Sequence, residues 1–132
     1  MTRRPLVYIA GPYRAPTESG VFENIMRARQ AAIEVWRAGG TALCPHLNTA
    51  FFGGLMPDEV WLEGDLEMLR RCDGIMMLPG WPGSAGASKE RSFAMNNGIG
   101  LFEHYDPFSD WGGASVMLKS WIASLPDRWS GR

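Results

Sequence analysis

Two carboxylate residues occur in sequence contexts that would suit catalysis. Glu90 follows the glycine-rich stretch Gly80-Trp81-Pro82-Gly83-Ser84-Ala85-Gly86-Ala87, and Asp65 lies among the apolar residues of a predicted helix. A carboxylate on an apolar helix face must be hydrogen-bonded, paired or directed into a polar cavity, and burial raises its pKa. A nucleophilic carboxylate beside a proton-donating acid supports covalent and general-acid catalysis. The alternative for Glu90 is structural: a carboxylate near a helix start, stabilised by the helix macrodipole.

The elements around Glu90 place it at a ligand-binding edge. Residues 75–78 are an apolar run typical of a strand buried on both faces, and the following prolines and glycines force a turn. Ser84 is the expected N-cap of a helix over about residues 87–96, which ends at Asn97-Gly98. In an open parallel sheet, ligands bind outside the carboxyl ends of the strands. The candidate ligand-binding residues of this turn are Trp81, Gly83, Ser84 and Gly86.

A second loop is expected to open on the same edge. Residues 6–10 are apolar and β-branched, which predicts a first strand. The turn after it brings backbone close enough to contact a ligand; its candidate binding residues are Gly11, Pro12, Tyr13 and Arg14. The alternative is an ordinary strand-to-helix loop. Arg14, Lys89 and Arg91 either reach an anionic group of a ligand or are simply solvated.

The next segment predicts a helix and a second strand. A helix over about residues 22–38 is indicated by apolar residues at three- and four-residue spacing, and Gly39-Gly40 ends it. The expected buried stripe comprises Phe22, Ile25, Met26, Ile33 and Trp36, interrupted by Arg29. Residues 41–44 form a strand, so the two strands and the helix make a right-handed parallel crossover.

Residues 45–49 form a third predicted loop at the ligand edge. His46 and Asn48 are candidate ligand contacts there, although a histidine satisfied by neighbouring backbone explains the pattern equally well. Residues 51–56 are apolar but broken by glycines, which suits either a flap over a pocket or a plain connection.

The remaining chain completes an α/β pattern. We expect a helix over 58–72, a strand over 99–102, a loop over 104–113 and a last helix over 114–125. The expected buried residues of the two helices are Val60, Trp61, Leu62, Leu66, Met68, Leu69, Val116, Met117, Leu118, Trp121 and Ile122. With no repeat or linker, residues 1–132 are predicted to form one domain with a parallel sheet of four to five strands.

Composition excludes several classes of function. The net charge is −1 and the basic residues do not cluster, which argues against nucleic acid or an anionic membrane as a partner. The apolar runs are strand-sized, so we expect a cytoplasmic protein without a signal peptide or spanning helix. Cys44 and Cys72 have no metal or redox spacing and are expected to be buried free thiols; we expect no metal and no cofactor.

Large apolar side chains are abundant for so short a chain. There are six tryptophans and eight methionines among 132 residues, and Trp111, Trp121 and Trp129 fall near the C-terminal end. This excess indicates a homo-oligomer interface or a segment that covers a ligand. The alternative is that these side chains simply pack on the domain itself.

Three short motifs together resemble the nucleoside 2-deoxyribosyltransferase-like family, which includes deoxynucleoside 5′-monophosphate N-glycosidases and small phage and bacterial members. The motifs are Tyr8-Ile9-Ala10-Gly11-Pro12-Tyr13, Asp65-Leu66-Glu67-Met68-Leu69 followed by Cys72-Asp73, and Ser84, Gly86 and Glu90. The resemblance covers roughly residues 6–103. It implies a flavodoxin-like (Rossmann-like) three-layer fold and an enzyme of nucleotide metabolism or salvage that acts on a nucleoside or nucleotide.

The resemblance also implies a role for each of the principal residues. Glu90 would be the nucleophile that forms a covalent deoxyribosyl intermediate, Asp65 would orient or protonate the leaving base, and Tyr8 would place a hydroxyl near the nucleophile. Ser84 and its backbone neighbours would hold the sugar hydroxyl or a 5′-phosphate. Members of the family often complete the site from a neighbouring subunit. A non-catalytic nucleotide-binding or sensor module on the same fold is the alternative function.

Overall fold

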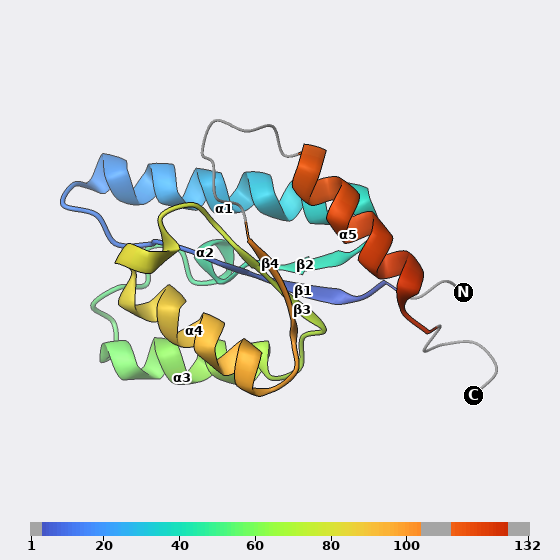
Figure 1. Cartoon of the computed structure of the whole chain (residues 1–132). Helices are drawn as coiled ribbons and strands as arrows, with labels where there is room; N and C mark the ends of the chain where they lie inside the picture. The colour runs from blue at the N-terminus through green and yellow to red at the C-terminus, as the bar shows by residue number, and fades with distance from the viewer. Residues whose placement is uncertain (1–3, 104–111, 127–132) are drawn as a thin grey trace.

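Strands and helices alternate along the chain and build one parallel sheet covered by helices (Figure 1). A computed structural model describes residues 4–103 and 112–126. The strands are β1 (Leu6–Ala10), β2 (Thr41–Leu43), β3 (Gly74–Met77) and β4 (Gly100–Glu103). The helices are α1 (Glu18–Ala38), α2 (Pro45–Asn48), α3 (Asp58–Leu69), the 3₁₀ turn η1 (Trp81–Gly83), α4 (Ala85–Asn96) and α5 (Gly112–Ser124).

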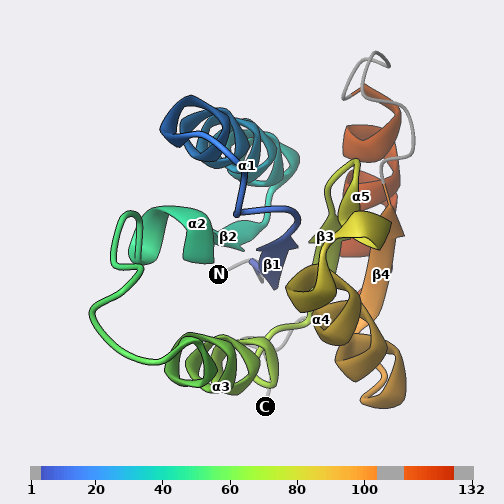
Figure 2. The same ribbon diagram turned by 90° about the vertical axis from the view of Figure 1, so that its left-hand side faces the viewer.

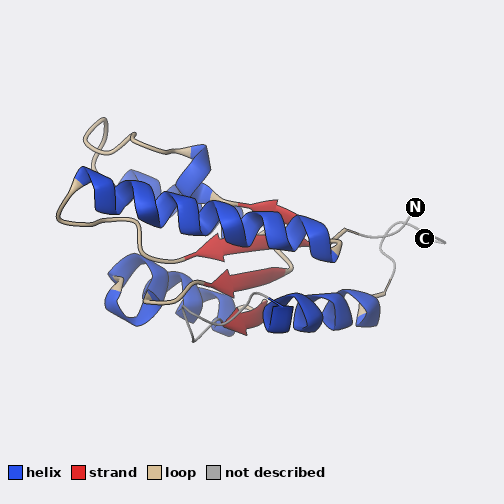
Figure 3. Ribbon diagram, turned by 90° about the horizontal axis from the view of Figure 1, so that it is seen from above, coloured by secondary structure: helices blue, strands red, loops and turns tan. Residues whose placement is uncertain are grey.

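The sheet has the order β2-β1-β3-β4, and all its strands run parallel. In the register of the central pair, Tyr8 lies beside Ile75 and Ala10 beside Met77. All four carboxyl ends therefore open on one edge, as expected from the sequence. Figures 2 and 3 show helices on both sides of the sheet. This arrangement confirms the predicted flavodoxin-like three-layer α/β fold.

The alternation of side chains along β1 divides the buried residues into two sets. Val7 and Ile9 pack with residues of α1 and α5, whereas Tyr8 and Ala10 pack with residues of α3 and α4. Strand β3 is buried along its whole length, as its apolar sequence predicts. The tyrosine on the central strand therefore faces the side of the sheet that carries α3 and α4.

Helix α1 begins earlier than predicted and buries a different face. Thr17 caps it by accepting a hydrogen bond from the Gly20 N–H, and Gly39 ends it with a φ of 102°, a conformation that favours glycine. Its buried residues are Ile25, Ala28, Ala31, Ala32, Val35 and Ala38. The expected stripe is thus wrong at Phe22, Met26 and Trp36, which are exposed. Alanines let the helix backbone approach the sheet closely, and the bulkier residues lie outside that contact.

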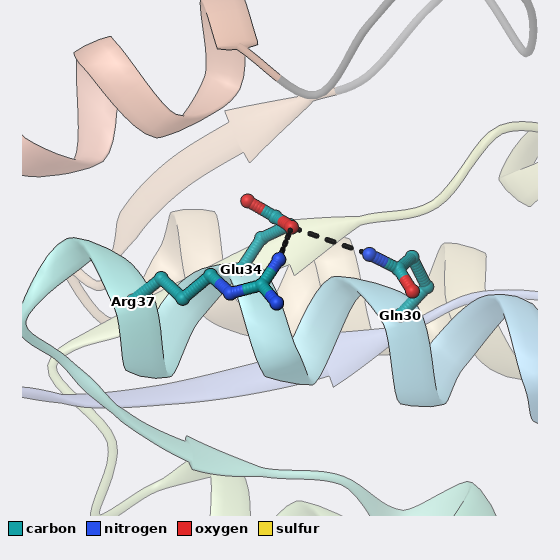
Figure 4. Close-up of polar contacts among 3 residues, drawn as sticks. All are labelled: Gln30, Glu34 and Arg37. Carbon is teal, nitrogen blue, oxygen red and sulfur yellow. Dashed lines mark hydrogen bonds and ion pairs between the residues drawn. The ribbon is translucent and has the colours of Figure 1, made fainter.

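The solvent side of α1 is held by local polar contacts. Glu34 accepts hydrogen bonds from Gln30 at 3.2 Å and from Arg37 at 3.0 Å, as Figure 4 shows. Pairs at three- and four-residue spacing are neighbours on a helix surface and add a few tenths of a kcal/mol each. Glu34 thus ties together two side chains on the surface of this helix.

Several other boundaries correct the sequence-based expectations. A short helix, α2, stands where a loop was expected, because Pro45 at its start favours helical φ and Asn48 N–H bonds back to the Cys44 carbonyl. Helix α3 ends at Leu69, three residues early, and α5 begins at Gly112. On α5, Leu118 is buried as predicted, but Val116 and Met117 are exposed. Of the loop expected at 104–113, residues 104–111 lie outside the described residues, as do Trp111 and Trp129, and residues 112–113 belong to α5.

Two further observations concern the cysteines and the helices. Both cysteines are free; Cys72 is buried as expected, whereas Cys44 is only partly buried. Among residues 4–103 and 112–126, no helix combines the length and apolar character needed to cross a membrane.

Candidate active site

Glu90 is a buried carboxylate on the second turn of α4. The helix is capped as predicted, because the Ser84 hydroxyl oxygen accepts a hydrogen bond from the Ala87 N–H at 3.2 Å. Capping fixes where the helix begins, and the 3.6-residue period then turns Glu90 inward. Only 7% of Glu90 is exposed. A carboxylate this buried needs a hydrogen-bonding partner.

Tyr8 supplies that partner from the central strand. Its side chain is fully buried, and its hydroxyl donates a short hydrogen bond to Oε2 of Glu90. Burial, together with the negative charge of Glu90, raises the pKa of the Tyr8 hydroxyl well above its usual value. The phenol therefore keeps its proton and acts as a fixed donor to Glu90. Glu90 and Tyr8 come from elements 82 positions apart in the chain.

Asp65 lies in the same cleft, on the partly buried face of α3. Burial raises its pKa to about 6. Burial raises the pKa of Glu90 further, to about 8; the hydrogen bond from Tyr8 opposes this rise, and the charge of Asp65 adds to it. The two carboxyl groups interact electrostatically, so their titration belongs to the pair. Between about pH 6 and pH 8 the pair holds one proton.

An open cleft of about 1000 Å³ surrounds these three side chains. It is bounded by the turn after β1, the start of α2, the segment 52–54, the exposed end of α3 and the turn before α4. Of the residues proposed from the sequence, the cleft brings together Tyr8, Gly11, Pro12, Tyr13, Arg14, His46, Asp65, Gly83, Ser84, Gly86 and Glu90. The cleft thus joins all three predicted loops with both carboxylates.

Gly11 is needed at the floor of the cleft for steric reasons. A Cβ atom at this position would lie 2.6 Å from Cβ of Leu78, well inside contact distance. The chain leaving β1 passes directly against the chain leaving β3. Glycine therefore allows the two turns that line the cleft to approach one another.

His46 is held by backbone. Its Nε2 donates a hydrogen bond to the carbonyl oxygen of Pro12 at 2.9 Å, and the Tyr13 ring meets its edge with the centroids 5.5 Å apart. Burial lowers the pKa of His46, which favours the neutral ring. Of the two alternatives left open by the sequence, the backbone-satisfied histidine is the one observed, although the side chain also lines the cleft.

Two contacts tie the turn after β1 to the segment across the cleft. The Tyr13 hydroxyl oxygen accepts a hydrogen bond from the Phe51 N–H at 2.9 Å, and Arg14 forms an ion pair with Asp58 at the start of α3. The residues 51–56 are exposed, as a flap would be. Both contacts lie near the mouth of the cleft, where a ligand would enter.

Two predicted binding residues lie outside the cleft lining. Asn48 is exposed on α2, because that segment is helical and turns its side chain to solvent. The ring of Trp81 is covered by the guanidinium of Arg91 at 4.6 Å, and Arg91 also donates to Oε1 of Glu103 at 2.6 Å. Of the cations considered from the sequence, Lys89 and Arg14 line the cleft, and Arg91 is engaged elsewhere.

Sequence reasoning missed part of the wall of the cleft. Trp61 and Leu62 line it from α3, and the ring of Phe52 contacts that of Trp61 with the centroids 5.9 Å apart. Trp61 was expected to belong to the core. The available signal was its spacing, because Trp61 precedes Asp65 by four residues and shares its helix face. Within the described ranges, no three His, Cys, Asp or Glu side chains are grouped to hold a metal ion.

The fold matches a solved structure of known activity. A 2-deoxyribosyltransferase from the psychrotolerant bacterium Bacillus psychrosaccharolyticus superposes with a TM-score of 0.60 and 18% sequence identity, over 86% of this chain and 95% of that one. At this identity the similarity shows a shared fold. No curated protein matches the sequence. Residues 5–102 match the family described as "Domain of unknown function (DUF4406)", and the chain therefore belongs to that family.

Proposed function

We propose that this protein cleaves or transfers at the N-glycosidic bond of a 2′-deoxynucleoside or its 5′-monophosphate, with Glu90 as the nucleophile. The observation that carries the proposal is the buried hydrogen bond from Tyr8 to Glu90 in an open cleft that Asp65 also lines. The shared fold with a 2-deoxyribosyltransferase adds support. Clefts with paired, strongly shifted carboxyl groups are characteristic of catalytic sites.

The reaction needs two carboxyl groups with opposite tasks. A carboxylate oxygen of Glu90 bonds to the anomeric carbon while the bond from that carbon to the base nitrogen breaks, through an oxocarbenium-like transition state. The electron pair of the broken bond stays on the base, which takes a proton from Asp65. Water or a second base then attacks the anomeric carbon and releases Glu90, giving hydrolysis or transfer.

The reaction needs one proton on the carboxyl pair, and the pair holds one proton between about pH 6 and pH 8. Because the pKa of Glu90 is the higher of the two, this proton lies mainly on Glu90. The reactive form, with Glu90 ionised and Asp65 protonated, is therefore the less populated arrangement of the singly protonated pair. The hydroxyl of Tyr8 stabilises the ionised form of Glu90 by donating to it. The base departs with the proton of Asp65, and the incoming water or base returns a proton in the second step.

The start of α4 is suited to the rest of the substrate. Ser84, Ala85 and Gly86 line the cleft where the helix begins, and Lys89 lines it one turn further on. Helix N-termini favour oxygen-rich and anionic groups. We propose that this turn holds a sugar hydroxyl or a 5′-phosphate.

The test is chromatographic. The protein is incubated with the four deoxynucleosides and the four deoxynucleoside monophosphates, with and without a second free base, beside Glu90→Gln and the surface control Glu34→Gln. We expect free base from the wild type and Glu34→Gln but not from Glu90→Gln. A new nucleoside would identify transfer. If folded wild type leaves every substrate intact, or Glu90→Gln equals wild type, the proposal is wrong.

The pH dependence offers an independent check. Below about pH 6 both carboxyl groups are protonated, and above about pH 8 neither holds a proton. Since the reactive form holds one proton, we expect a bell-shaped profile of kcat/KM with its maximum between these values. A profile that rises steadily with pH through this range would contradict the assigned proton donor.

A further inference from the structure

The indole N–H of Trp61 is a buried donor without an acceptor. Among the described residues, only Nε1 of Trp61 and Oε2 of Glu103 are buried side-chain polar atoms without a hydrogen bond. The other carboxylate oxygen of Glu103 accepts from Arg91. The side chain of Trp61 has a single polar group, the indole N–H, which can only donate a hydrogen bond. Buried polar groups are otherwise almost always paired, so this one requires a reason.

The position of Trp61 indicates a ligand as the missing acceptor. Trp61 lines the cleft and lies four residues before Asp65, so the two side chains stand on one face of α3 with their Cβ atoms about 5–6 Å apart. Asp65 interacts electrostatically with Glu90 and Tyr8 and so marks the inner end of the cleft. Asp58 marks the outer end, because it pairs with Arg14 where α3 begins. Trp61 thus stands one turn outward from the proton donor.

The proposed reaction fixes which part of the substrate meets Trp61. The base nitrogen that leaves the sugar takes its proton at Asp65, so the ring of the base extends from there along α3 toward the mouth. Its distal edge, opposite the glycosidic bond, lies at the level of Trp61. The Phe52 ring, which contacts Trp61, stands beside the same edge. The Trp61 N–H is inaccessible to solvent in this structure, so the inference requires a side chain near it to shift as the base enters. Phe52, which is 43% exposed, has room to shift.

We infer that the Trp61 N–H donates a hydrogen bond to a carbonyl oxygen on the distal edge of the leaving base. The inference rests on the proposed function and names its substrate class: 6-oxopurine and 4-oxopyrimidine deoxynucleosides, in preference to their 6-amino and 4-amino counterparts. An exocyclic amino group would turn its own donors toward the indole N–H and leave it unpaired. A single neutral hydrogen bond discriminates by roughly tenfold.

The decisive experiment follows the indole resonance of Trp61 by ¹⁵N–¹H spectroscopy. Glu90→Gln protein, which leaves the ligand intact, is titrated with deoxyinosine and with deoxyadenosine, which differ in the oxygen or amino group at C6. We expect the Trp61 indole proton to move downfield with deoxyinosine alone, and deoxyinosine to bind about tenfold more tightly. Assignment by triple-resonance spectra makes the result independent of any further variant.

Two negative results are distinguishable. If backbone resonances of Tyr8 and Gly86 shift with both ligands while the Trp61 indole does not respond, nucleosides bind and the inference about Trp61 is overturned. If no cleft resonance shifts with either nucleoside or with the 5′-monophosphate of either, the proposed function itself fails, and the assignment of Trp61 with it.

Turnover provides a second readout. Trp61→Phe keeps an aromatic ring but removes the donor, so the ratio of kcat/KM for deoxyinosine to that for deoxyadenosine should fall about tenfold. Trp36→Phe is the matched control, because Trp36 is exposed near the end of α1 and stacks on Arg4. An unchanged ratio in folded Trp61→Phe would overturn the inference.

Discussion

The two faces of the sheet share a central strand but bury different kinds of side chain. On the α1 and α5 side, Val7 and Ile9 join a cluster made of apolar residues. On the α3 and α4 side, Tyr8 is buried among apolar residues and donates to the buried Glu90. Alternation along one strand is enough to separate the two environments. The side with α1 and α5 buries apolar side chains, whereas the side with α3 and α4 also buries the titratable groups Tyr8 and Glu90.

Burial has opposite consequences on the two faces. Removing apolar surface from water stabilises the fold. Removing Glu90 and Asp65 from water raises their pKa values, so ionising them in the folded protein opposes folding. Apolar residues on both faces therefore offset the cost of burying these carboxyl groups, which lie on the α3 and α4 side. Variants on the two faces should separate these contributions.

The largest effect is expected at Glu90. Glu90→Gln keeps the shape of the side chain and an acceptor for Tyr8 but removes the nucleophile, so base release should fall by about a thousandfold or more. Chromatographic initial rates measure this loss. A residual rate within tenfold of wild type would show that Glu90 is not the nucleophile.

The same variant should gain stability at high pH. The pKa of Glu90 is about 8 in the folded protein against 4.5 for the unperturbed group, so the folded state binds more protons between these values. The contribution of Glu90 to stability therefore falls as pH rises from 4.5 to 8, and the fall is complete above that range. Urea unfolding should find Glu90→Gln more stable by a few kcal/mol at pH 9 and nearly equal at pH 4.5. Equal stability at pH 9 would contradict the raised pKa.

On the opposite face, Leu118→Ala should affect stability and leave the chemistry intact. Leu118 on α5 is fully buried, so its truncation should lower the free energy of unfolding by about 3 kcal/mol. Val116→Ala on the same helix is the control, because Val116 is 67% exposed and its loss should cost less than about 0.5 kcal/mol. A drop of tenfold or more in kcat/KM for folded Leu118→Ala would show that the faces are coupled.

Tyr8→Phe should have a smaller effect on rate and a distinctive effect on pH dependence. The Tyr8 hydroxyl lowers the pKa of Glu90, so its loss moves the alkaline limb of the kcat/KM profile to higher pH. At pH 7 the rate should fall roughly tenfold to a hundredfold, the worth of a hydrogen bond to a charged group. If the alkaline limb stays at the same pH in Tyr8→Phe, the Tyr8 hydroxyl does not lower the pKa of Glu90.

The smallest effect is expected at the mouth of the cleft. Arg14 and Asp58 are 77% and 63% exposed, so Arg14→Ala should change the free energy of unfolding by less than about 1 kcal/mol. If Arg14 holds a 5′-phosphate, KM for the monophosphate rises and KM for the nucleoside does not. Arg37→Ala, which breaks an exposed ion pair with Glu34 on α1, is the control for both measurements.

Strands and their shared edge were predictable from short-range patterns. The apolar runs at 6–10 and 75–78 predict β1 and β3 to within one residue. Central strands of a parallel sheet are buried on both faces, so a continuous apolar run is enough to identify them. The rule that parallel strands open on one edge also anticipates that the turns after β1 and β3 line one cleft. That Tyr8 and Asp65 belong to the same site as Glu90 was implied only by the family resemblance. The roles of these residues stay predictions.

What the sequence could not supply depends on packing between distant elements. The buried face of α1 carries alanines such as Ala28 and Ala32, which a search for large apolar side chains overlooks. The bond from His46 to the Pro12 carbonyl joins two separate turns, and no local pattern encodes it. The sequence predicts Trp61 to be a core residue, and only the folded structure shows that its N–H has no acceptor among the described residues.

The strand order has a consequence for how the chain is made. Strand β2 joins one edge of β1, β3 joins the other edge, and β4 then joins β3. A chain that leaves the ribosome from its N-terminus therefore adds each strand at a free edge, without inserting one between strands already paired. Tyr8, Asp65 and Glu90 all precede β4 in this order of synthesis. The groups proposed for catalysis are thus present before the last strand and α5 emerge.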